Sequence, residues 1–298
     1  MLEFKPIELI DKPKIDAAMW AENSRSADFN FANIFMWDNT YKQSVAHSHN
    51  RAFVKARYSE SPFFVYPIGS GDLQTALEEL QDYARGNGFS FCLRGITKEH
   101  IRHLESLCPE RFMFREDRAY FDYIYSAEKL ASLAGKKLHA KRNHINRFIE
   151  SNDWSFEPLS TETVPECMAL LAEWESTFPN PLDADLVAEH AAIYRAFKNF
   201  EYLQLEGGIL RSSGKLIAFT IGEKISSDTY NIHFEKAHAD IQGSYPMINR
   251  EFARYIIEAH PEIQYINRED DMGKENLRKA KLSYYPEFLL EKYTTVCM

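Results

Sequence analysis

The chain has few of the features that mark secreted, metal-binding and membrane-spanning proteins. Among its 298 residues are four cysteines, Cys92, Cys108, Cys167 and Cys297, whose spacing fits neither a disulfide framework nor a zinc site. No uncharged apolar run approaches the ~18 residues that a membrane-spanning helix needs. The first residues, MLEFKPIELIDKPK, lack the apolar core of a signal peptide. These absences predict a protein of the reducing cytoplasm, without a membrane span or a bound metal.

An excess of positive charge is also missing. Lysine and arginine number 35 against 44 aspartates and glutamates, which gives a net charge of −9. The surface as a whole therefore repels nucleic acid and anionic membranes, and a polyanion must meet a local basic patch. Hydrophobic residues make up 45% of the chain, which excludes disorder as a whole-chain state. The length allows one large or two ordinary domains.

Several familiar catalytic signatures do not occur. Gly69-Ser70-Gly71 is followed by no lysine-serine pair, so we interpret it as a turn and not as a phosphate loop. His100 and His103 have helical spacing but no third metal ligand near them in the sequence. A Gly-x-Ser-x-Gly elbow is missing as well. The sequence therefore disfavours zinc chemistry and serine-hydrolase chemistry.

Apolar periodicity predicts alternating strands and helices along the chain. In the first half, helices are predicted at 73–85 and 98–107, with Asp72 and Thr97 as their N-caps. In the second half, three apolar segments within 203–234 are joined by short Ser/Gly/Asp turns, which predicts an antiparallel meander. The fold class is therefore α/β (α+β), with mixed, mostly antiparallel sheets flanked by helices.

A basic segment interrupts this acidic chain. Residues 136–147 contain lysines, arginines and histidines but no acid. Such a face suits phosphates or a ribose-phosphate backbone, and the candidate substrate-binding residues in it are Lys141, Arg142, Asn143 and His144. A structural alternative is that the segment pairs with the acids at 269–271 or lines an interdomain seam. The segment 126–150 is predicted to link a domain of residues 1–125 to a domain of residues 151–298.

The stretch 263–286 has the layout of a ligand site. A short apolar strand is followed by acidic residues, a glycine and a helix that Pro286 ends, which is where open α/β sheets usually bind ligands. The helix is expected to turn Leu277, Ala280 and Tyr284 inward. Candidate substrate-binding residues are Asn267, Glu269, Asp270, Lys274, Lys279, Lys281, Tyr284 and Tyr285. The alternative is a solvated helix with salt bridges, because charge runs usually lie at the surface.

Three stretches carry a resemblance to a known family: Lys136–Phe148 (KKLHAKRNHINRF), Asp240–Asn249 (DIQGSYPMIN) and Asn267–Pro286 (NREDDMGKENLRKAKLSYYP). They resemble the C-terminal-like domains of phosphatidylglycerol lysyltransferase. The resemblance implies two tandem GNAT-like acyltransferase domains, related to the Fem-type aminoacyltransferases. It also implies transfer of an acyl or aminoacyl group to an amine or hydroxyl acceptor in an interdomain cleft.

The resemblance further implies a place for the acyl donor. Acetyltransferases of this superfamily hold the pyrophosphate of coenzyme A on a glycine-rich turn before a helix, and Gln242, Gly243 and Ser244 stand at that place. One glycine of the usual turn is missing and Pro246 has no N–H, so another donor, such as the aminoacyl end of tRNA, is also compatible. Acyl-CoA and aminoacyl-tRNA are therefore the candidate donors, with a small molecule as acceptor.

Acyl transfer needs a base, a stabilised oxyanion and an acid for the leaving group. Glu235 and Asp240 flank the predicted donor turn and are the candidate bases. Tyr245, Tyr284 and Tyr285 are the candidate acids. Two alternatives stay open beside the aminoacyltransferase. One is a coenzyme A-dependent N-acetyltransferase, and the other is a non-catalytic ligand-binding module on the same fold. The sequence leaves the oligomeric state open.

Overall fold

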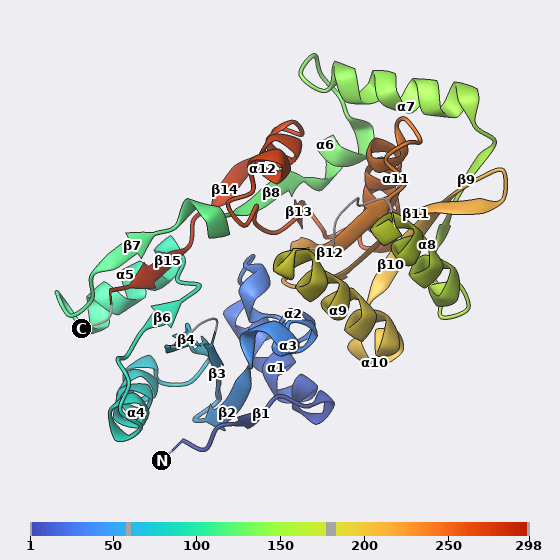
Figure 1. Cartoon of the computed structure of the whole chain (residues 1–298). Coiled ribbons are helices and arrows are strands. Elements are labelled where there is room, and N and C mark those ends of the chain that lie inside the picture. Colours follow the sequence, from blue (N-terminus) through green and yellow to red (C-terminus); the bar gives the residue numbers. More distant parts are fainter. Residues whose placement is uncertain (1, 58–60, 177–182, 297–298) are drawn as a thin grey trace. The chain divides into compact units, whose positions relative to one another are not determined.

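The structure, a computed structural model, describes residues 2–57, 61–176 and 183–296 (Figure 1). The chain divides into two compact units. Unit 1 comprises Met1–Asp122, Asp270–Glu275 and Leu289–Met298, and unit 2 comprises Tyr123–Glu269 and Asn276–Phe288. The division after Asp122 lies close to the predicted end of the first domain at residue 125. The C-terminal residues belong to unit 1, whereas the sequence interpretation placed 151–298 in one domain.

Unit 1 is built on one mixed sheet with the strand order β1-β2-β3-β4-β6, in which β5 also pairs with β3. All these pairs are antiparallel except β4 with β6. A second, small sheet joins β7 to β15. The strands are Lys5–Pro6 (β1), Ser44–Ser48 (β2), Arg51–Arg57 (β3), Pro62–Val65 (β4), Ile68–Gly69 (β5), Leu93–Arg94 (β6), Phe114–Glu116 (β7) and Tyr293–Thr295 (β15).

The helices of unit 1 begin where local caps predict. Asp72 accepts a hydrogen bond from Thr75 N at 2.8 Å, and Thr97 Oγ1 accepts one from His100 N at 3.4 Å, which confirms both predicted N-caps. The helices are Leu9–Asp11 (η1), Lys12–Glu22 (α1), Ala27–Phe29 (η2), Phe31–Met36 (α2), Asp38–Tyr41 (α3), Leu73–Gly86 (α4), Lys98–Leu107 (α5) and Arg118–Tyr120 (η3). The apolar pattern of residues 51–58 predicts a strand; β3 ends at Arg57, and Tyr58 lies outside the described residues.

Unit 2 is organised by a longer mixed sheet with the order β14-β8-β13-β12-β11-β10-β9. β10, β11 and β12 form the predicted antiparallel meander, and β12 pairs with β13 in parallel. The strands are Asp122–Ser126 (β8), Trp154–Pro158 (β9), Glu206–Ser212 (β10), Lys215–Lys224 (β11), Thr229–Ala237 (β12), Tyr265–Asn267 (β13) and Phe288–Leu290 (β14). The mixed, mostly antiparallel sheets with flanking helices confirm the predicted fold class.

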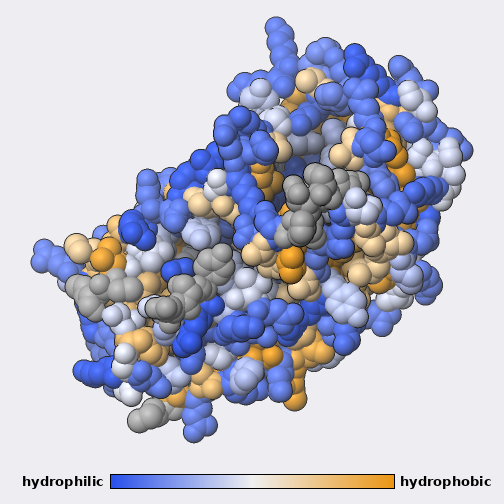
Figure 2. Space-filling model, viewed as in Figure 1, coloured by the Kyte–Doolittle hydropathy of each residue, from blue (hydrophilic) through white to orange (hydrophobic). Residues whose placement is uncertain are grey.

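Helices cover both faces of this sheet. α11 packs on β10, β11 and β12 and against α6 and α7, while α8 contacts β11 and β12. The ring of Tyr230 meets Phe252 of α11, and Phe219 meets Phe197 of α9. The helices are Ala127–Ser132 (α6), His139–Ser151 (α7), Val164–Ser176 (α8), Ala184–Lys198 (α9), Phe200–Leu203 (α10), Ser244–Ala259 (α11) and Glu275–Leu282 (α12). Figure 2 shows hydrophilic side chains over most of one face of the molecule, with small apolar areas between them.

Candidate active site

A β-bulge in β12 organises the polar residues of unit 2. The register between β11 and β12 shifts between Ile221 and Gly222, and His233 is the extra residue on β12. A bulge changes the direction of the side chains that follow it. Asn231 before the bulge and Glu235 after it therefore point to opposite faces of the sheet, although both are odd-numbered.

The sheet also opens beside this bulge. β12 pairs with β13 only over Thr229–Asn231, and then continues to Ala237 without β13 alongside. Glu235 lies in this unpaired part, and Arg268 follows the last residue of β13. The ends of parallel strands that part are a usual place for ligand-binding residues in such sheets.

A buried ion pair spans this opening on the face covered by α11. Arg268 Nη2 lies 3.0 Å from Glu235 Oε1, and their side chains are 14% and 9% exposed. Asn249 of α11 donates a longer hydrogen bond of 3.4 Å to the other carboxylate oxygen. Burial opposes the charge of Arg268, but the Glu235 carboxylate holds the pKa of the guanidinium above its usual value. The arginine is therefore a fixed cation beside a fixed carboxylate.

Tyr284 and Lys141 cover the ion pair. The ring centroid of Tyr284 lies 5.1 Å from Arg268 Cζ and 4.0 Å from Lys141 Nζ, so two cations meet one ring. Burial, and then the charge of Arg268, lowers the pKa of Lys141 to about 8, although Glu235 opposes this effect. Lys141 is thus partly deprotonated near neutral pH, and an anion bound beside it would restore its charge.

The end of α12 is fixed to the same place by hydrogen bonds. Tyr125 Oη donates to the carbonyl oxygen of Lys281 at 2.8 Å, and Lys281 Nζ donates to the carbonyl oxygen of Arg268. Burial raises the pKa of both Tyr125 and Tyr284, so both hydroxyls stay protonated. These bonds hold Tyr284 over Arg268 and limit the freedom of the candidate site.

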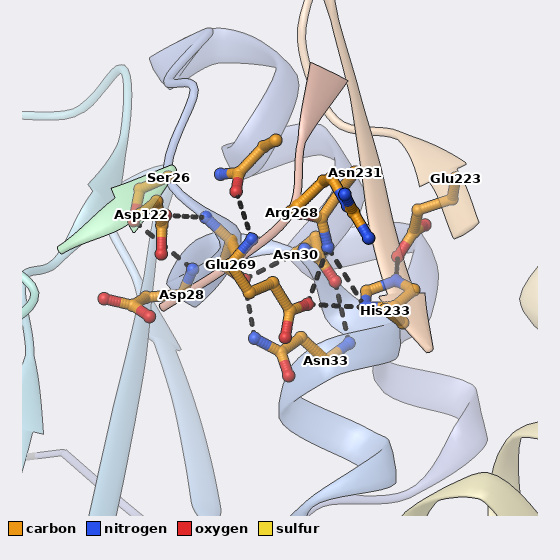
Figure 3. Close-up of polar contacts among 12 residues, drawn as sticks. Ser26, Asp28, Asn30, Asn33, Asp122, Glu223, Asn231, His233, Arg268 and Glu269 are labelled. Carbon is orange, nitrogen blue, oxygen red and sulfur yellow. Dashed lines mark hydrogen bonds and ion pairs between the residues drawn. The ribbon is translucent and has the colours of Figure 1, made fainter. Parts of the chain in front are cut away.

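A second charged cluster occupies the opposite face of the sheet. Figure 3 shows His233 between Glu223 and Glu269, with ring nitrogens Nε2 and Nδ1 each 3.0 Å from a carboxylate oxygen. Asn231 Nδ2 also donates to Glu269, at 2.8 Å. Burial would lower the pKa of His233, but the two carboxylates raise it to about 9. The imidazole is therefore a buried cation that links β11, β12 and the residue after Arg268.

Residues 21–296 match the protein family described as phosphatidylglycerol lysyltransferase, C-terminal. The chain belongs to this family. It is similar to a conserved protein of unknown function from Bacteroides thetaiotaomicron VPI-5482, with 41% identity, a TM-score of 0.94 and full coverage of both chains. It is also similar to the C-terminal domain of a putative lysylphosphatidylglycerol synthetase from Agrobacterium fabrum, with 16% identity, a TM-score of 0.66, and 95% and 91% of the two chains covered.

A curated relative is the uncharacterized protein MYCGA3080 of Mycoplasmoides gallisepticum (strain R(low / passage 15 / clone 2)), which is 26% identical over 178 residues. The match covers 58% of this chain and 54% of that protein, so the chain spans about half the length of this relative. The chain also shares its fold with a tandem GNAT protein (10% identity, 99% and 98% covered, TM-score 0.50) and with FemX (8% identity, 98% and 96% covered, TM-score 0.57). These similarities confirm the predicted GNAT-like and Fem-like fold.

The structure brings part of the predicted site of this family member together. Glu235, Lys141 and Tyr284 meet around Arg268, and Lys281 binds the Arg268 carbonyl. The pKa of Tyr245 is raised by burial, with a smaller contribution from the charge of Glu235, as expected of a nearby phenol that keeps its proton. Asn267 is buried at the end of β13, and its side-chain oxygen accepts a hydrogen bond from Glu269 N.

The other predicted residues have different surroundings. Arg142 donates to the carbonyl oxygens of Leu133 and Gly135 and so fixes the turn before α7. Asp240 has a side chain that is 85% exposed and lies 3.9 Å from His238 Nδ1. Asp270 and Lys274 belong to unit 1, and Glu269 belongs to the His233 cluster. Asn143, His144, Lys279 and Tyr285 are exposed.

The predicted donor turn is packed against α7. Gly243 has φ +92°, and a Cβ there would lie 2.6 Å from His144 O and 2.9 Å from Phe148 Cβ. Ser244 Oγ donates to the carbonyl oxygen of His238 at 2.7 Å, while Gln242 is exposed. The glycine therefore has a packing role, whatever the donor is. Donor binding at this turn stays a prediction.

Sequence reasoning did not assign a role to Arg268, Asn249, Glu223 or His233. The sequence does hold a clue to two of these residues. Glu223 and His233 are ionisable residues within apolar strands. Ionisable groups in such positions are rarely buried without a partner. The inward prediction for Leu277 and Ala280 was wrong, since both are exposed and Tyr284 alone of the three is buried. Hydrogen bonds at Lys281 hold the C-terminal end of α12 in place. The exposed side of this helix therefore carries no buried apolar residues.

Within the described residues, no helix has both the length and the apolar character needed to cross a bilayer. The same residues contain no group of three or more His, Cys, Asp or Glu side chains arranged to hold a metal ion. Cys92, Cys108 and Cys167 are free thiols, and Cys297 lies outside the described residues.

Proposed function

We propose that this chain transfers an acyl or aminoacyl group to an amine or hydroxyl acceptor at the Glu235–Arg268 pair. The supporting observation is a buried carboxylate held beside a buried guanidinium, where two parallel strands part. Buried charges are costly, and they are often found where chemistry needs them. Membership of the lysyltransferase C-terminal family supports the same class of reaction.

In this proposal, Glu235 accepts the proton of the acceptor as its nitrogen or oxygen attacks the carbonyl carbon of the donor. The new bond forms, the bond from that carbon to the leaving group breaks, and Tyr245 gives the leaving group a proton. Asn249 orients the carboxylate of Glu235. Arg268 and Lys141 are cations that stabilise negative charge on the donor and in the transition state.

The proposed donor is an aminoacyl-tRNA or an acyl-CoA, and the proposed acceptor is a small molecule. Both donors carry phosphates and an activated carbonyl, which matches the cations at Lys141 and Arg268. An interdomain cleft, as the sequence resemblance implies, stays a prediction. A coenzyme A-dependent acetyltransferase and a ligand-binding module are the other outcomes of the test below.

The test compares the wild type with Glu235→Gln and with Glu258→Gln, a control at an exposed position of α11. Each protein is incubated with aminoacyl-tRNA or with acetyl-CoA and a panel of amines. With aminoacyl-tRNA, the assay follows loss of the aminoacyl ester. With acetyl-CoA, it follows release of the free thiol of coenzyme A. We expect Glu235→Gln to lower turnover by about 10²–10⁴-fold, the usual contribution of a general base. The control should keep wild-type turnover.

The two donors separate the alternatives. Turnover with acetyl-CoA alone assigns the acetyltransferase, and binding of either donor without turnover assigns the ligand-binding module. Wild-type turnover in Glu235→Gln would remove Glu235 from the chemistry.

A further inference from the structure

Unit 1 contains a pocket that the proposed reaction does not use. It has a volume of about 470 Å³ and lies between α1 and the tip of the β2–β3 hairpin. Lys14 and three alanines of α1 line one side, residues 47–51 line the other, and Ser70 completes the rim. The volume is in the range of small-molecule sites.

Two glycines fix the shape of this rim. A Cβ at Gly69 would lie 2.2 Å from Asn50 O, and a Cβ at Gly71 would lie 1.6 Å from His49 O. The Gly69–Gly71 loop therefore lies directly against the backbone of the hairpin tip, and no side chain fits between them. The turn that the sequence analysis set aside is a rigid wall of the pocket.

Two cations, Arg51 and Lys14, line the pocket. Arg51 donates from Nε to Gly71 O at 2.8 Å and from Nη1 to Pro67 O at 2.6 Å, so carbonyls hold its guanidinium in place but do not neutralise it. Among the residues that the structure describes, no carboxylate lies within ion-pair distance of Arg51 or Lys14. Three guanidinium N–H bonds of Arg51 and the ammonium of Lys14 remain for a ligand.

A buried nitrogen adds to this set. Nε2 of His47 is inaccessible to solvent and has no hydrogen-bond partner in the described part of the chain. Burial, and then the charge of Lys14, lowers the pKa of His47, which favours the neutral imidazole. A neutral ring can carry its proton on Nε2, so this nitrogen can donate to a ligand oxygen that displaces the atoms covering it.

The acids nearby are already engaged. Glu79 accepts a hydrogen bond from Ser48 Oγ at 3.3 Å and lies 3.6 Å from His49 Nε2. Glu22 is bound to His100 Nε2 at 3.0 Å and to Gly69 N at 3.3 Å. Neither carboxylate lines the pocket, so the lining itself carries positive charge only.

We propose that this pocket binds the phosphate group of a small molecule. Arg51 and Lys14 supply the charge, and Ser70 and His47 line the same space. Guanidinium and ammonium groups together are the usual partners of phosphate in proteins. The alanines of α1 leave a flat, apolar wall for the rest of the ligand. This site is independent of the Glu235–Arg268 site and of the proposed transfer reaction.

The test is a calorimetric titration of the full chain with orthophosphate and with AMP, at constant ionic strength. Lys14→Gln removes one cation without breaking a bond that the structure records, so the fold is expected to persist. The control is Lys42→Gln, an exposed lysine of unit 1 that does not line the pocket. We expect Lys14→Gln to weaken binding at least about tenfold, since a hydrogen bond to a charged group contributes about 1.5–3 kcal/mol. The control should bind as the wild type does.

Two results would overturn the proposal. One is that neither compound binds at a ligand concentration of about 10 mM, which corresponds to a very weak dissociation constant. The other is binding that Lys14→Gln leaves unchanged, because the ligand would then lie elsewhere. Tighter binding of AMP than of orthophosphate assigns the site to a phosphomonoester, and equal binding assigns it to free phosphate. Either pattern, if Lys14 is required, supports the site.

Discussion

At the scale of residues, unit 2 keeps its buried charges in pairs on opposite faces of one strand. Glu235 pairs with Arg268 on the α11 face, and His233 lies between Glu223 and Glu269 on the other face. The bulge at His233 produces this separation. Arg268 and Glu269 are consecutive residues, so the two clusters share one backbone segment.

The His233 cluster predicts a pH dependence of stability. The folded-state pKa of His233 is about 9, above the usual value of about 6.5, so its stabilisation is complete below pH 6.5 and is lost as the pH rises through 9. We expect the free energy of unfolding to fall by on the order of 2 kcal/mol across this window. Urea unfolding at pH 6.5 and pH 9.5 measures it. His233→Gln should remove this fall, and equal falls in both proteins would contradict the assignment.

The charge of Lys141 is expected to lower the stability of the fold and to strengthen substrate binding. Its folded-state pKa of about 8 lies below the usual lysine value, so its charge costs stability below pH 8, and the cost vanishes as the pH rises from 8 towards 10.5. Lys141→Met should raise Tm at pH 7 by about 3 °C, after discounting for solvent screening. It should also raise KM about tenfold by loss of a charged contact. Lys137→Met, at an exposed position on the same segment, should change neither value.

At the scale of elements, α7 and α11 meet at a backbone contact. Gly243 gives this contact its close approach, since a Cβ there would strike His144 O and Phe148 Cβ. α7 carries Lys141 and α11 carries Asn249, so the contact sets the positions of two candidate site residues. Helix caps, by contrast, are decided locally, which is why Asp72 and Thr97 were predicted correctly.

Gly243→Ala and Gly135→Ala form a matched pair that measures this contact. Both glycines have φ +92°, but a Cβ at Gly135 would meet nothing within 4 Å. We expect Gly135→Ala to cost about 1–2 kcal/mol of unfolding free energy from backbone strain alone. Gly243→Ala should cost at least about 2 kcal/mol more, because a well-packed contact must open. Urea unfolding of the two variants tests this, and equal losses would show that the contact relaxes freely.

At the scale of the whole molecule, the chain returns to unit 1 after building unit 2. Lys292 in the C-terminal segment is buried, with Nζ 2.8 Å from Asp28 Oδ1 and 2.8 Å from Asp122 Oδ1. Asp122 also accepts a hydrogen bond from Ala27 N, and Figure 3 shows it beside Ser26 and Asp28. Burial opposes the charge of Lys292, but the carboxylates of Asp122 and Asp28 raise its pKa. The triad therefore ties the two ends of unit 1 together.

Lys292→Met should destabilise the protein strongly. It leaves the fully buried Asp122 without its cation, and breaking a buried ion pair costs about 3–5 kcal/mol. Lys98→Met is the control, because Lys98 pairs with Glu291 at the surface, where ion pairs contribute about 0–1 kcal/mol. Unfolding free energies from urea titration compare the two. A Lys292→Met variant as stable as the control would mean that the triad contributes nothing to unit 1.

Part of the candidate site could be predicted from the sequence, and part could not. Glu235, Lys141 and Tyr284 were predicted from charge pattern, periodicity and family resemblance, and they do meet. The pairing of Glu235 with Arg268 spans 33 residues, and no local pattern specifies it. The register shift at His233 is likewise invisible in the sequence, and it decides which face Glu235 occupies. Asp240 and Arg142 have suitable side chains, but the fold directs them elsewhere.

The sequence by itself determined the alternation of strands and helices, the helix caps and the family, because each depends on neighbours within a few residues or on whole motifs. The tertiary structure alone decided which charges are paired, since burial and distance fix the cost of a charge and both depend on contacts between distant segments. For the same reason it alone decided that the last strand of the chain completes unit 1.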